Sequence, residues 1–174
     1  AAVALIPAVL LCDEPCILEN VPEISDVSIS LRILYEMGAQ VDYINRTTVR
    51  ISTVGLKNFC VPYESARRMR ASYYFLGALL GKFGRARVSM PGGCPLGDRP
   101  IDQHLKAFSA LGAKCDIQHG MVDLTADKLT GNQIYLDVVS VGATMNAMLA
   151  AVRAEGLTVI ENAAKEPHIV DLAN

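Results

Sequence analysis

The chain has 174 residues, of which 51% are hydrophobic and 20% are charged, and its formal net charge at pH 7 is -2. A domain of this length buries roughly 70% of the surface that its unfolded chain exposes, so we expect one globular domain with a substantial core. Lysine and arginine are scattered along the chain without forming a basic stripe. This pattern argues against a nucleic-acid partner.

The first apolar run, Ala1 to Cys12, contains Pro7 and is shorter than the roughly 20 residues that cross a bilayer. It also lacks the basic flank and the cleavage site of a secretory signal, so we expect no membrane partner and a cytoplasmic location. The cysteines are odd in number and irregularly spaced, which predicts neither a disulfide framework nor a metal site. Most of them are expected to be small buried hydrophobes. They are Cys12, Cys16, Cys60, Cys94 and Cys115.

The chain continues with a predicted strand, an amphipathic helix and a hairpin. The strand is Cys16 to Asn20. The helix has four apolar residues on one face, and a glycine ends it in the left-handed conformation. Gln40 to Ile44 and Val49 to Ile51 alternate in polarity and predict the hairpin. The helix face and its stop are Val27, Leu31, Leu34, Met37 and Gly38-Ala39.

The same helix and stop recur 74 positions later in the chain. A strand, Arg87 to Met90, precedes this second helix, which is expected to start at Pro100. Lys114 to Ile117 and Val122 to Leu124 predict the second hairpin, and Thr158 to Asn162 resembles the first strand and begins a third unit. The second helix face and its stop are Ile101, Leu105, Phe108, Leu111 and Gly112-Ala113.

Two longer apolar helices, Tyr63 to Phe83 and Gly142 to Glu155, separate these units and are expected to be buried. The sequence therefore predicts an α/β (α+β) domain of repeated strand-helix-hairpin-helix units, with helices inside and sheets outside. The chain lacks an initiating Met, and its third unit stops early within a predicted helix, so we expect a fragment truncated at both ends. One domain is expected over residues 1–174, with repeat units at about 1–60, 61–130 and 131–174.

A glycine-rich loop interrupts the second unit, between its strand and its helix. The loop, Pro91 to Arg99, contains three glycines and two prolines around Cys94. A cysteine near a helix N-terminus and five residues from Arg99 has surroundings that favour a thiolate and attract an anion. Cys94 is therefore the candidate reactive thiol. Loop composition alone leaves open a turn in which the cysteine merely packs.

Three arginines near the start of the first long helix could help to hold phosphate. They are Arg67, Arg68 and Arg70, and this signal alone is weak, because a solvated basic face is the commoner explanation of such a cluster. Likewise, Asp102 and His104 fit a surface pair better than a catalytic dyad. The sequence contains no zinc, dinucleotide or phosphate-loop signature.

Several short motifs together resemble the UDP-N-acetylglucosamine 1-carboxyvinyltransferases, a family of enolpyruvyl transferases. The likeness runs from Ala1 to Asn174, and the Pro-Gly-Gly-Cys loop followed by Arg-Pro is its most specific part. The motifs are Met69-Arg70-Ala71-Ser72, Phe83-Gly84-Arg85-Ala86, Pro91-Gly92-Gly93-Cys94, Arg99-Pro100-Ile101-Asp102, Ser140-Val141-Gly142-Ala143-Thr144 and Glu161-Asn162-Ala163-Ala164.

The resemblance implies an inside-out α/β barrel fold, in which two similar domains close over the site. It implies transfer of the enolpyruvyl group from phosphoenolpyruvate to the 3-hydroxyl of UDP-N-acetylglucosamine, the first committed step of peptidoglycan synthesis, with no metal or other cofactor. The missing second domain would be a partner, so the fragment alone should be inactive. The alternatives are a non-catalytic nucleotide-sugar-binding paralogue and the sister enzyme 3-phosphoshikimate 1-carboxyvinyltransferase, which lacks such a thiol.

The resemblance also implies the roles of individual residues. Cys94 would protonate the methylene carbon of phosphoenolpyruvate, Arg99 would neutralise its phosphate, and Arg70 would contact the phosphates of the nucleotide sugar. Gln103 and Val138 depart from some members, which carry Leu and Lys there. The family's Lys-Asn pair belongs just before Ala1, and a catalytic Asp and another Arg belong to the other domain. The implied lining of the nucleotide-sugar pocket is Pro100, Ile101, Asp102, Gln103, Ser140, Val141 and Gly142.

Overall fold

The computed structural model describes residues 1–90 and 100–174, and within them it shows a mixed α/β chain. Its helices are α1 (Ala2–Ala8), α2 (Ser25–Met37), α3 (Tyr63–Ala66), α4 (Tyr74–Phe83), α5 (Asp102–Ala110), α6 (Val141–Ala151) and α7 (Pro167–Ala173), with short 3-10 helices η1 (Val9–Leu11) and η2 (Arg70–Tyr73). Its strands are β1 (Cys16–Leu18), β2 (Gln40–Asn45), β3 (Thr48–Ser52), β4 (Arg85–Ser89), β5 (Lys114–Gln118), β6 (Met121–Thr125), β7 (Gln133–Tyr135) and β8 (Val159–Glu161).

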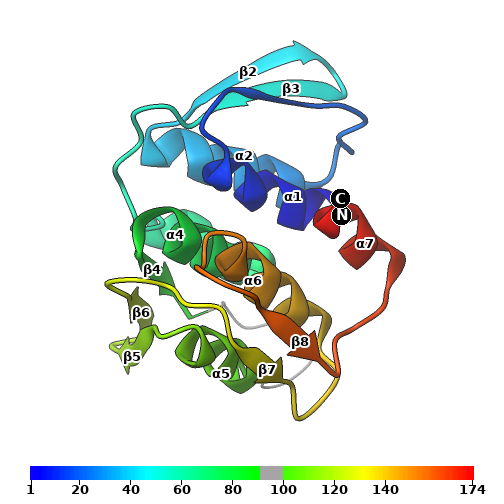
Figure 1. Ribbon diagram of the computed structural model, residues 1–174. Coiled ribbons are helices and arrows are strands. Elements are labelled where there is room, and N and C mark those ends of the chain that lie inside the picture. Colours follow the sequence, from blue (N-terminus) through cyan, green and yellow to red (C-terminus); the bar gives the residue numbers. More distant parts are fainter. Residues whose placement is uncertain (91–99) are drawn as a thin grey trace.

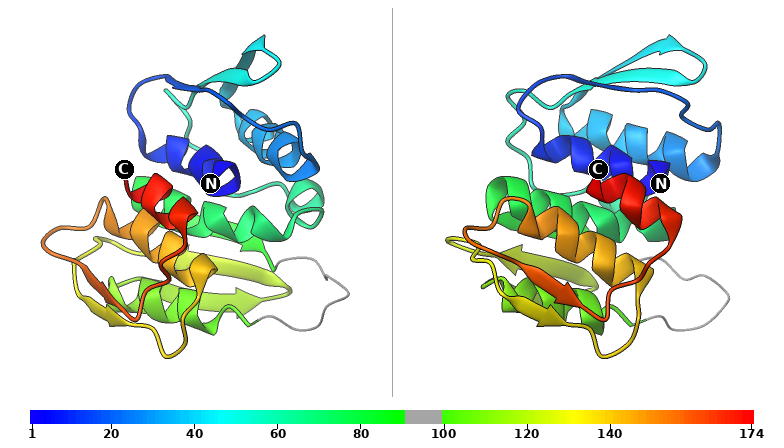
Figure 2. Two further views of the ribbon diagram at one scale, coloured as in Figure 1. Left: turned by 90° about the vertical axis from the view of Figure 1, so that its right-hand side faces the viewer. Right: turned by 45° about the vertical axis from the view of Figure 1, so that its right-hand side comes forward.

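The elements lie in layers, with helices between outer strands (Figure 1). The hairpin of β2 and β3 covers α1 and α2, and α4 and α6 lie beneath these helices. Below α4 and α6 lie the strands β4 to β8, together with α5 (Figure 2). The first seven residues of α4, from Tyr74 to Leu80, are all buried. The sequence prediction of an apolar, buried central helix is therefore confirmed for this segment.

The two three-stranded sheets have the same topology. Their strand orders are β1-β3-β2 and β4-β6-β5, and both are antiparallel. In each unit an amphipathic helix precedes the hairpin, and a left-handed glycine follows the helix, with φ of 108° at Gly38 and 94° at Gly112. The predicted hairpins and glycine stops are thus confirmed at their predicted positions.

A parallel pairing also recurs between the units. Strand β7 pairs with β8 through Ile134 and Ile160, and an isolated parallel bridge joins Cys60 to Arg87. Asn20 follows shortly after antiparallel β1, Asn162 directly follows parallel β8, and both have positive φ, of 55° and 54°. Asparagine tolerates this conformation better than most residues, so both segments leave their sheets in the same way.

The predicted helix from Tyr63 to Phe83 is wrong, because the chain breaks into α3, η2 and α4. The break falls at Met69, whose backbone is extended with φ of -134° and ψ of 122°. The Met69 side chain is buried, and Ser30 of α2 donates a hydrogen bond to its sulfur at 3.3 Å. Burial of this methionine against α2 is what overrides the helical pattern of the sequence.

Two predicted helix boundaries also shift. Helix α6 ends at Ala151 and not at Glu155, because the Glu155 backbone pairs with the neighbouring loop through Leu129 and Gly131 at 2.9 and 2.7 Å. Helix α5 begins at Asp102 and not at Pro100, because Ile101 has the non-helical backbone of a helix cap.

The cysteines differ from expectation. Cys12 is exposed, and Cys16, Cys60 and Cys115 are only partly buried, so the prediction that most cysteines are buried hydrophobes is wrong for these four. Cys94 lies outside the described residues. In the part of the chain that the structure describes, no helix is both long enough and apolar enough to span a membrane.

Candidate active site where helices begin

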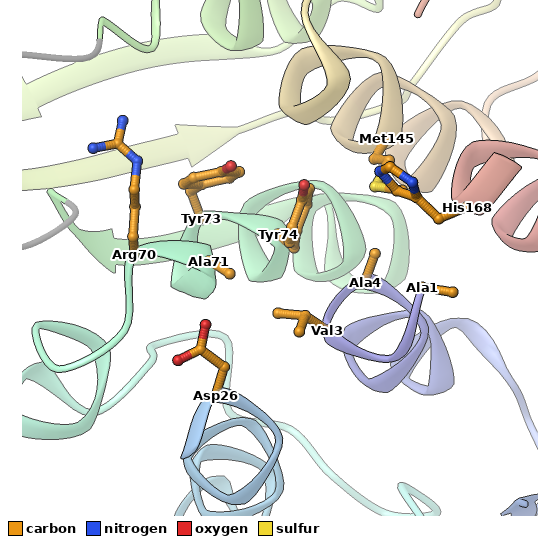
Figure 3. Close-up of a pocket in the computed structure, with 10 residues that line it drawn as sticks. All are labelled: Ala1, Val3, Ala4, Asp26, Arg70, Ala71, Tyr73, Tyr74, Met145 and His168. Carbon is orange, nitrogen blue, oxygen red and sulfur yellow. The ribbon is translucent and has the colours of Figure 1, made fainter. Parts of the chain in front are cut away.

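The first turns of several helices meet around an open cavity of about 360 Å³. Residues at or beside the starts of α1, α2, α4 and α7 line it, together with a methionine from α6 (Figure 3). Figure 3 shows Arg70, Tyr73 and Tyr74 directed into the same region, with Asp26 on the other side of Ala71. The lining residues are Ala1, Val3, Ala4, Asp26, Arg70, Ala71, Tyr73, Tyr74, Met145 and His168.

This arrangement favours anions. Unpaired backbone N–H groups and aligned peptide dipoles make the N-terminal end of a helix partly positive, so converging helix starts create a positive field. Arg70 adds a full positive charge and a planar guanidinium that matches phosphate and carboxylate oxygens. Asp26 contributes the opposing negative charge among the lining residues.

The structure separates the three arginines that the sequence groups together. Arg67 is exposed at the end of α3, with its guanidinium 5.6 Å from the Tyr63 ring and 3.9 Å from Glu64. Arg68 is also exposed, whereas Arg70 opens η2 and lines the cavity. The interpretation as a solvated basic face therefore fits Arg67 and Arg68, and the anion-binding interpretation fits Arg70.

The starts of α5 and α6 form a second group of polar residues. Gln103 donates to Asp102 at 2.8 Å and to Asp137 at 3.2 Å, and its carbonyl accepts the backbone N–H of Asp137 at 2.8 Å. Lys106 pairs with the same Asp137 at 2.6 Å. These hydrogen bonds hold the loop before α6 against the first turn of α5. They also lower the pKa of Asp137, chiefly through Lys106 and then Gln103.

Ser140 caps α6, because its hydroxyl accepts the backbone N–H of Ala143 at 3.3 Å. Gly142, in the first turn, is buried against α5 and η2. A Cβ atom at Gly142 would lie 3.0 Å from the Tyr73 hydroxyl and 3.0 Å from Cε1 of His104. The absence of a side chain at this position therefore allows the first turn of α6 to pack closely against His104 of α5 and Tyr73 at the end of η2.

His104 is not the surface residue that the sequence suggested. It is 5% exposed, its ring lies 4.8 Å from the Tyr73 ring, and its Nδ1 lies 2.9 Å from the side-chain nitrogen of Asn146. Asp102 is exposed, so the predicted surface pair of Asp102 and His104 is wrong. Burial lowers the pKa of His104 to about 4, with Arg70 acting in the same direction and Asp102 opposing it.

This shift predicts a pH-dependent loss of stability. An unfolded histidine protonates near pH 6.5, whereas folded His104 stays neutral until about pH 4, so its contribution is complete above pH 6.5 and lost as the pH falls toward 4. We expect His104→Gln to flatten the decrease in melting temperature over this window. His119→Asn alters an exposed histidine and should leave that slope unchanged. Equal slopes for wild type and His104→Gln would contradict the assignment.

The comparisons with known proteins agree with the α/β fold. A family model described as EPSP synthase (3-phosphoshikimate 1-carboxyvinyltransferase) matches residues 1–174. The chain belongs to this family. It is 53% identical over 174 residues to UDP-N-acetylglucosamine 1-carboxyvinyltransferase 3 of Caldanaerobacter subterraneus subsp. tengcongensis. It is 55% identical over 173 residues to UDP-N-acetylglucosamine 1-carboxyvinyltransferase 2 of Listeria monocytogenes serotype 4b. The resemblance identified from the motifs is confirmed.

The chain spans 42% and 41% of the length of these two relatives, and 100% and 99% of the chain is aligned. Among solved structures, the enolpyruvyl transferase NikO from Streptomyces tendae matches 98% of the chain and 40% of its own, with a TM-score of 0.84 at 24% identity. EPSP synthase from Acinetobacter baumannii matches 97% of the chain and 40% of its own, with a TM-score of 0.72 at 21% identity. At these identities the two structures show a shared α/β fold.

Within this enolpyruvyl transferase fold, most of the site residues predicted from the sequence lie in the two groups described above. Arg70 lines the cavity, Ile101 and Gln103 are buried at the start of α5, and Pro100 is exposed beside them. Val141 is partly buried at the start of α6. Cys94 and Arg99 lie outside the described residues, so their predicted roles stay predictions.

Sequence reasoning missed three residues that organise the site, namely Tyr73, Asn146 and Asp137. Asn146 was the easiest to find, because it is the single amide within the largely apolar α6. A buried side-chain amide nearly always has a hydrogen-bond partner, so an Asn in a helix expected to be buried indicates a contact with another element.

Proposed function

We propose that the protein containing this chain transfers the enolpyruvyl group of phosphoenolpyruvate to the 3-hydroxyl of UDP-N-acetylglucosamine and releases phosphate. The supporting observation is 53–55% identity, along essentially the whole chain, to proteins named for this activity. Such a reaction serves peptidoglycan synthesis, and with it cell shape and division. The cytoplasm, where both substrates are made, is the proposed location.

The described geometry supports an anionic substrate. Both phosphoenolpyruvate and the diphosphate of a nucleotide sugar carry negative charge, and the helix starts and Arg70 supply positive potential. We assign Arg70 to the nucleotide-sugar phosphates. The starts of α5 and α6 would line the nucleotide-sugar pocket, largely through backbone groups. The assigned lining is Pro100, Ile101, Asp102, Gln103, Ser140, Val141 and Gly142.

Cys94 and Arg99 carry the proposed chemistry. A thiol can deliver a proton to the methylene carbon and can also form a covalent adduct, and Arg99 would neutralise the phosphate that leaves. No metal or other cofactor enters this scheme. The second domain would supply an Asp and a further Arg, so activity is expected to require the longer protein.

The layered arrangement supports an inside-out α/β barrel as the architecture of the complete domain. The matching sheets β1-β3-β2 and β4-β6-β5 favour repeat units near residues 1–60 and 61–130, and β8 would begin an incomplete third unit at 131–174.

Within residues 1–90 and 100–174, no group of three or more His, Cys, Asp or Glu side chains could hold a metal ion.

Two other functions compete with this proposal. The family description names the enzyme that uses shikimate 3-phosphate, and a paralogue could bind the nucleotide sugar without catalysis. Incubation of the full-length protein with phosphoenolpyruvate and an equimolar mixture of both acceptors distinguishes them by mass spectrometry of the products. We expect only the carboxyvinyl ether of UDP-N-acetylglucosamine. Modified shikimate 3-phosphate would establish the sister activity, and no product would favour the binding paralogue.

The proposed thiol also predicts sensitivity to epoxide phosphonates such as fosfomycin. In the presence of UDP-N-acetylglucosamine, we expect one alkylation that maps to the peptide from Pro91 to Arg99. Intact-mass and peptide-mass spectrometry of the full-length protein measure it, with exposed Cys12 as an internal control that should stay unmodified. An unchanged mass would count against Cys94 as the reactive residue.

A further inference from the structure

A buried asparagine, Asn146, connects helix α6 to the first turn of α4. Its side-chain Oδ1 accepts the backbone N–H of Gly77 at 2.9 Å, and its Nδ2 donates to the backbone carbonyl of Tyr73 at 3.0 Å. The side chain is fully buried. Tyr73 and Gly77 bound the first turn of α4, so one amide holds that turn at both ends.

The same amide fixes the protonation of His104. The Nδ2 atom of Asn146 lies 2.9 Å from Nδ1 of His104. Because Oδ1 accepts from Gly77, the nitrogen side of the amide faces the ring, and it can only donate. The ring atom Nδ1 must therefore accept, which leaves the proton of the neutral imidazole on Nε2. Burial, which lowers the pKa of His104 to about 4, keeps the ring neutral.

The donor created in this way lies beside the start of α6. A Cβ atom built on Gly142 would be 3.2 Å from Nε2 of His104, so this nitrogen borders the first turn of α6. The hydrogen bond from Asn146 to the Tyr73 carbonyl also leads to the cavity. Tyr73 is the last residue of the short helix η2, which begins at Arg70, and both residues line the cavity. Asn146 itself lies next to the cavity-lining residue Met145.

We infer that Asn146 is a positioning residue for the binding of a nucleoside diphosphate sugar. Through Tyr73 it fixes the segment that carries Arg70, and through His104 it sets an Nε2–H donor beside Gly142 in the first turn of α6. The choice of ligand rests on the proposed function. The tautomer of His104 does not rest on it, and can be measured without any substrate.

The decisive variant is Asn146→Asp, which keeps the size of the side chain and the acceptor for Gly77 but removes both N–H donors. The new oxygen would face the Tyr73 carbonyl and His104 Nδ1, with Asp102, Arg70 and the Tyr73 phenol as the other polar groups nearby. We expect His104 to acquire a proton on Nδ1. In the full-length enzyme, the KM for UDP-N-acetylglucosamine should rise about ten- to a hundred-fold while kcat changes less than about three-fold.

A matched control is Asn132→Asp. Asn132 also accepts a backbone N–H, from Gln133 at 2.8 Å, and donates to a backbone carbonyl, of Ala110 at 2.9 Å, but it is exposed and does not line the cavity. It should change neither KM nor the His104 signals. Comparable changes in both variants would indicate a general effect of losing an amide, and would overturn the inference.

Nitrogen-15 NMR of histidine-labelled full-length protein reads the tautomer directly. Wild-type His104 should show protonated Nε2 and unprotonated Nδ1, and a proton on Nδ1 in the wild type would overturn the inference even if Asn146→Asp failed to fold. An unchanged KM in folded Asn146→Asp would also overturn it. If wild type used no nucleotide sugar, the proposed function would fail while the NMR result would still stand or fall on its own.

Discussion

Gly77→Ala is expected to lower the free energy of unfolding by about 3 kcal/mol, near the upper end of typical overpacking costs. A Cβ atom at Gly77 would lie 2.5 Å from the backbone oxygen of Asn146 and 2.6 Å from its side-chain oxygen. Alanine favours a helix over glycine by roughly 1 kcal/mol, but contacts this short with fixed oxygens outweigh that gain. Urea denaturation of the full-length protein measures the change.

Gly156→Ala is the comparison for this substitution. Gly156 has φ of 89°, and a Cβ atom added there would have nothing within 4 Å, so alanine costs only backbone strain, of about 1 kcal/mol. We expect Gly77→Ala to be the more destabilising of the two. A Gly77→Ala protein as stable as wild type would show that α4 and α6 are not packed as closely as described.

Arg70→Ala should reduce kcat/KM for UDP-N-acetylglucosamine by about thirty-fold or more. Loss of one partner from a charged, desolvated hydrogen-bonding pair costs about 2–5 kcal/mol, and each 1.4 kcal/mol is a factor of ten. Since Arg70 is assigned to substrate binding and not to bond breaking, most of the loss should appear in KM. Arg70→Lys keeps the charge but loses the planar fork, so it should recover only part of the activity.

Arg67→Ala tests whether position explains this effect. Arg67 lies three residues earlier, carries the same charge and is exposed outside the cavity. Surface ion pairs contribute little, so its removal should leave kcat/KM within about three-fold of wild type. Equal effects at Arg67 and Arg70 would support the interpretation as a general basic face and contradict the assigned role of Arg70.

The local sequence pattern predicted the amphipathic helices and hairpins of the repeat units correctly, because side-chain periodicity and turn residues depend on interactions between neighbours in the chain. The apolar spacing from Val27 to Met37, the glycine at Gly38 and the hairpin after it appear in the structure as predicted. The long helix after Tyr63 could not be predicted correctly, since its break depends on burying Met69 against α2, a contact between residues 39 positions apart. Such tertiary contacts leave no periodic signal in the sequence.

The candidate site likewise contains residues that local motifs predicted and one feature, the burial of His104, that depends on tertiary packing. Arg70, Gln103 and Ser140 were predicted as site residues from motifs, and the structure places them at or beside helix starts. The burial of His104 was not predictable, because an Asp-x-His sequence on an amphipathic helix fits a surface pair as well. Only the packing of Tyr73 and Gly142 around the ring shows that the ring is enclosed.

The most direct test of the proposed activity is phosphate release from phosphoenolpyruvate by the full-length protein, measured with and without UDP-N-acetylglucosamine and repeated with Cys94→Ala. Release that requires the nucleotide sugar and disappears in Cys94→Ala is the predicted result. No release with UDP-N-acetylglucosamine, or undiminished release by Cys94→Ala, would contradict the account.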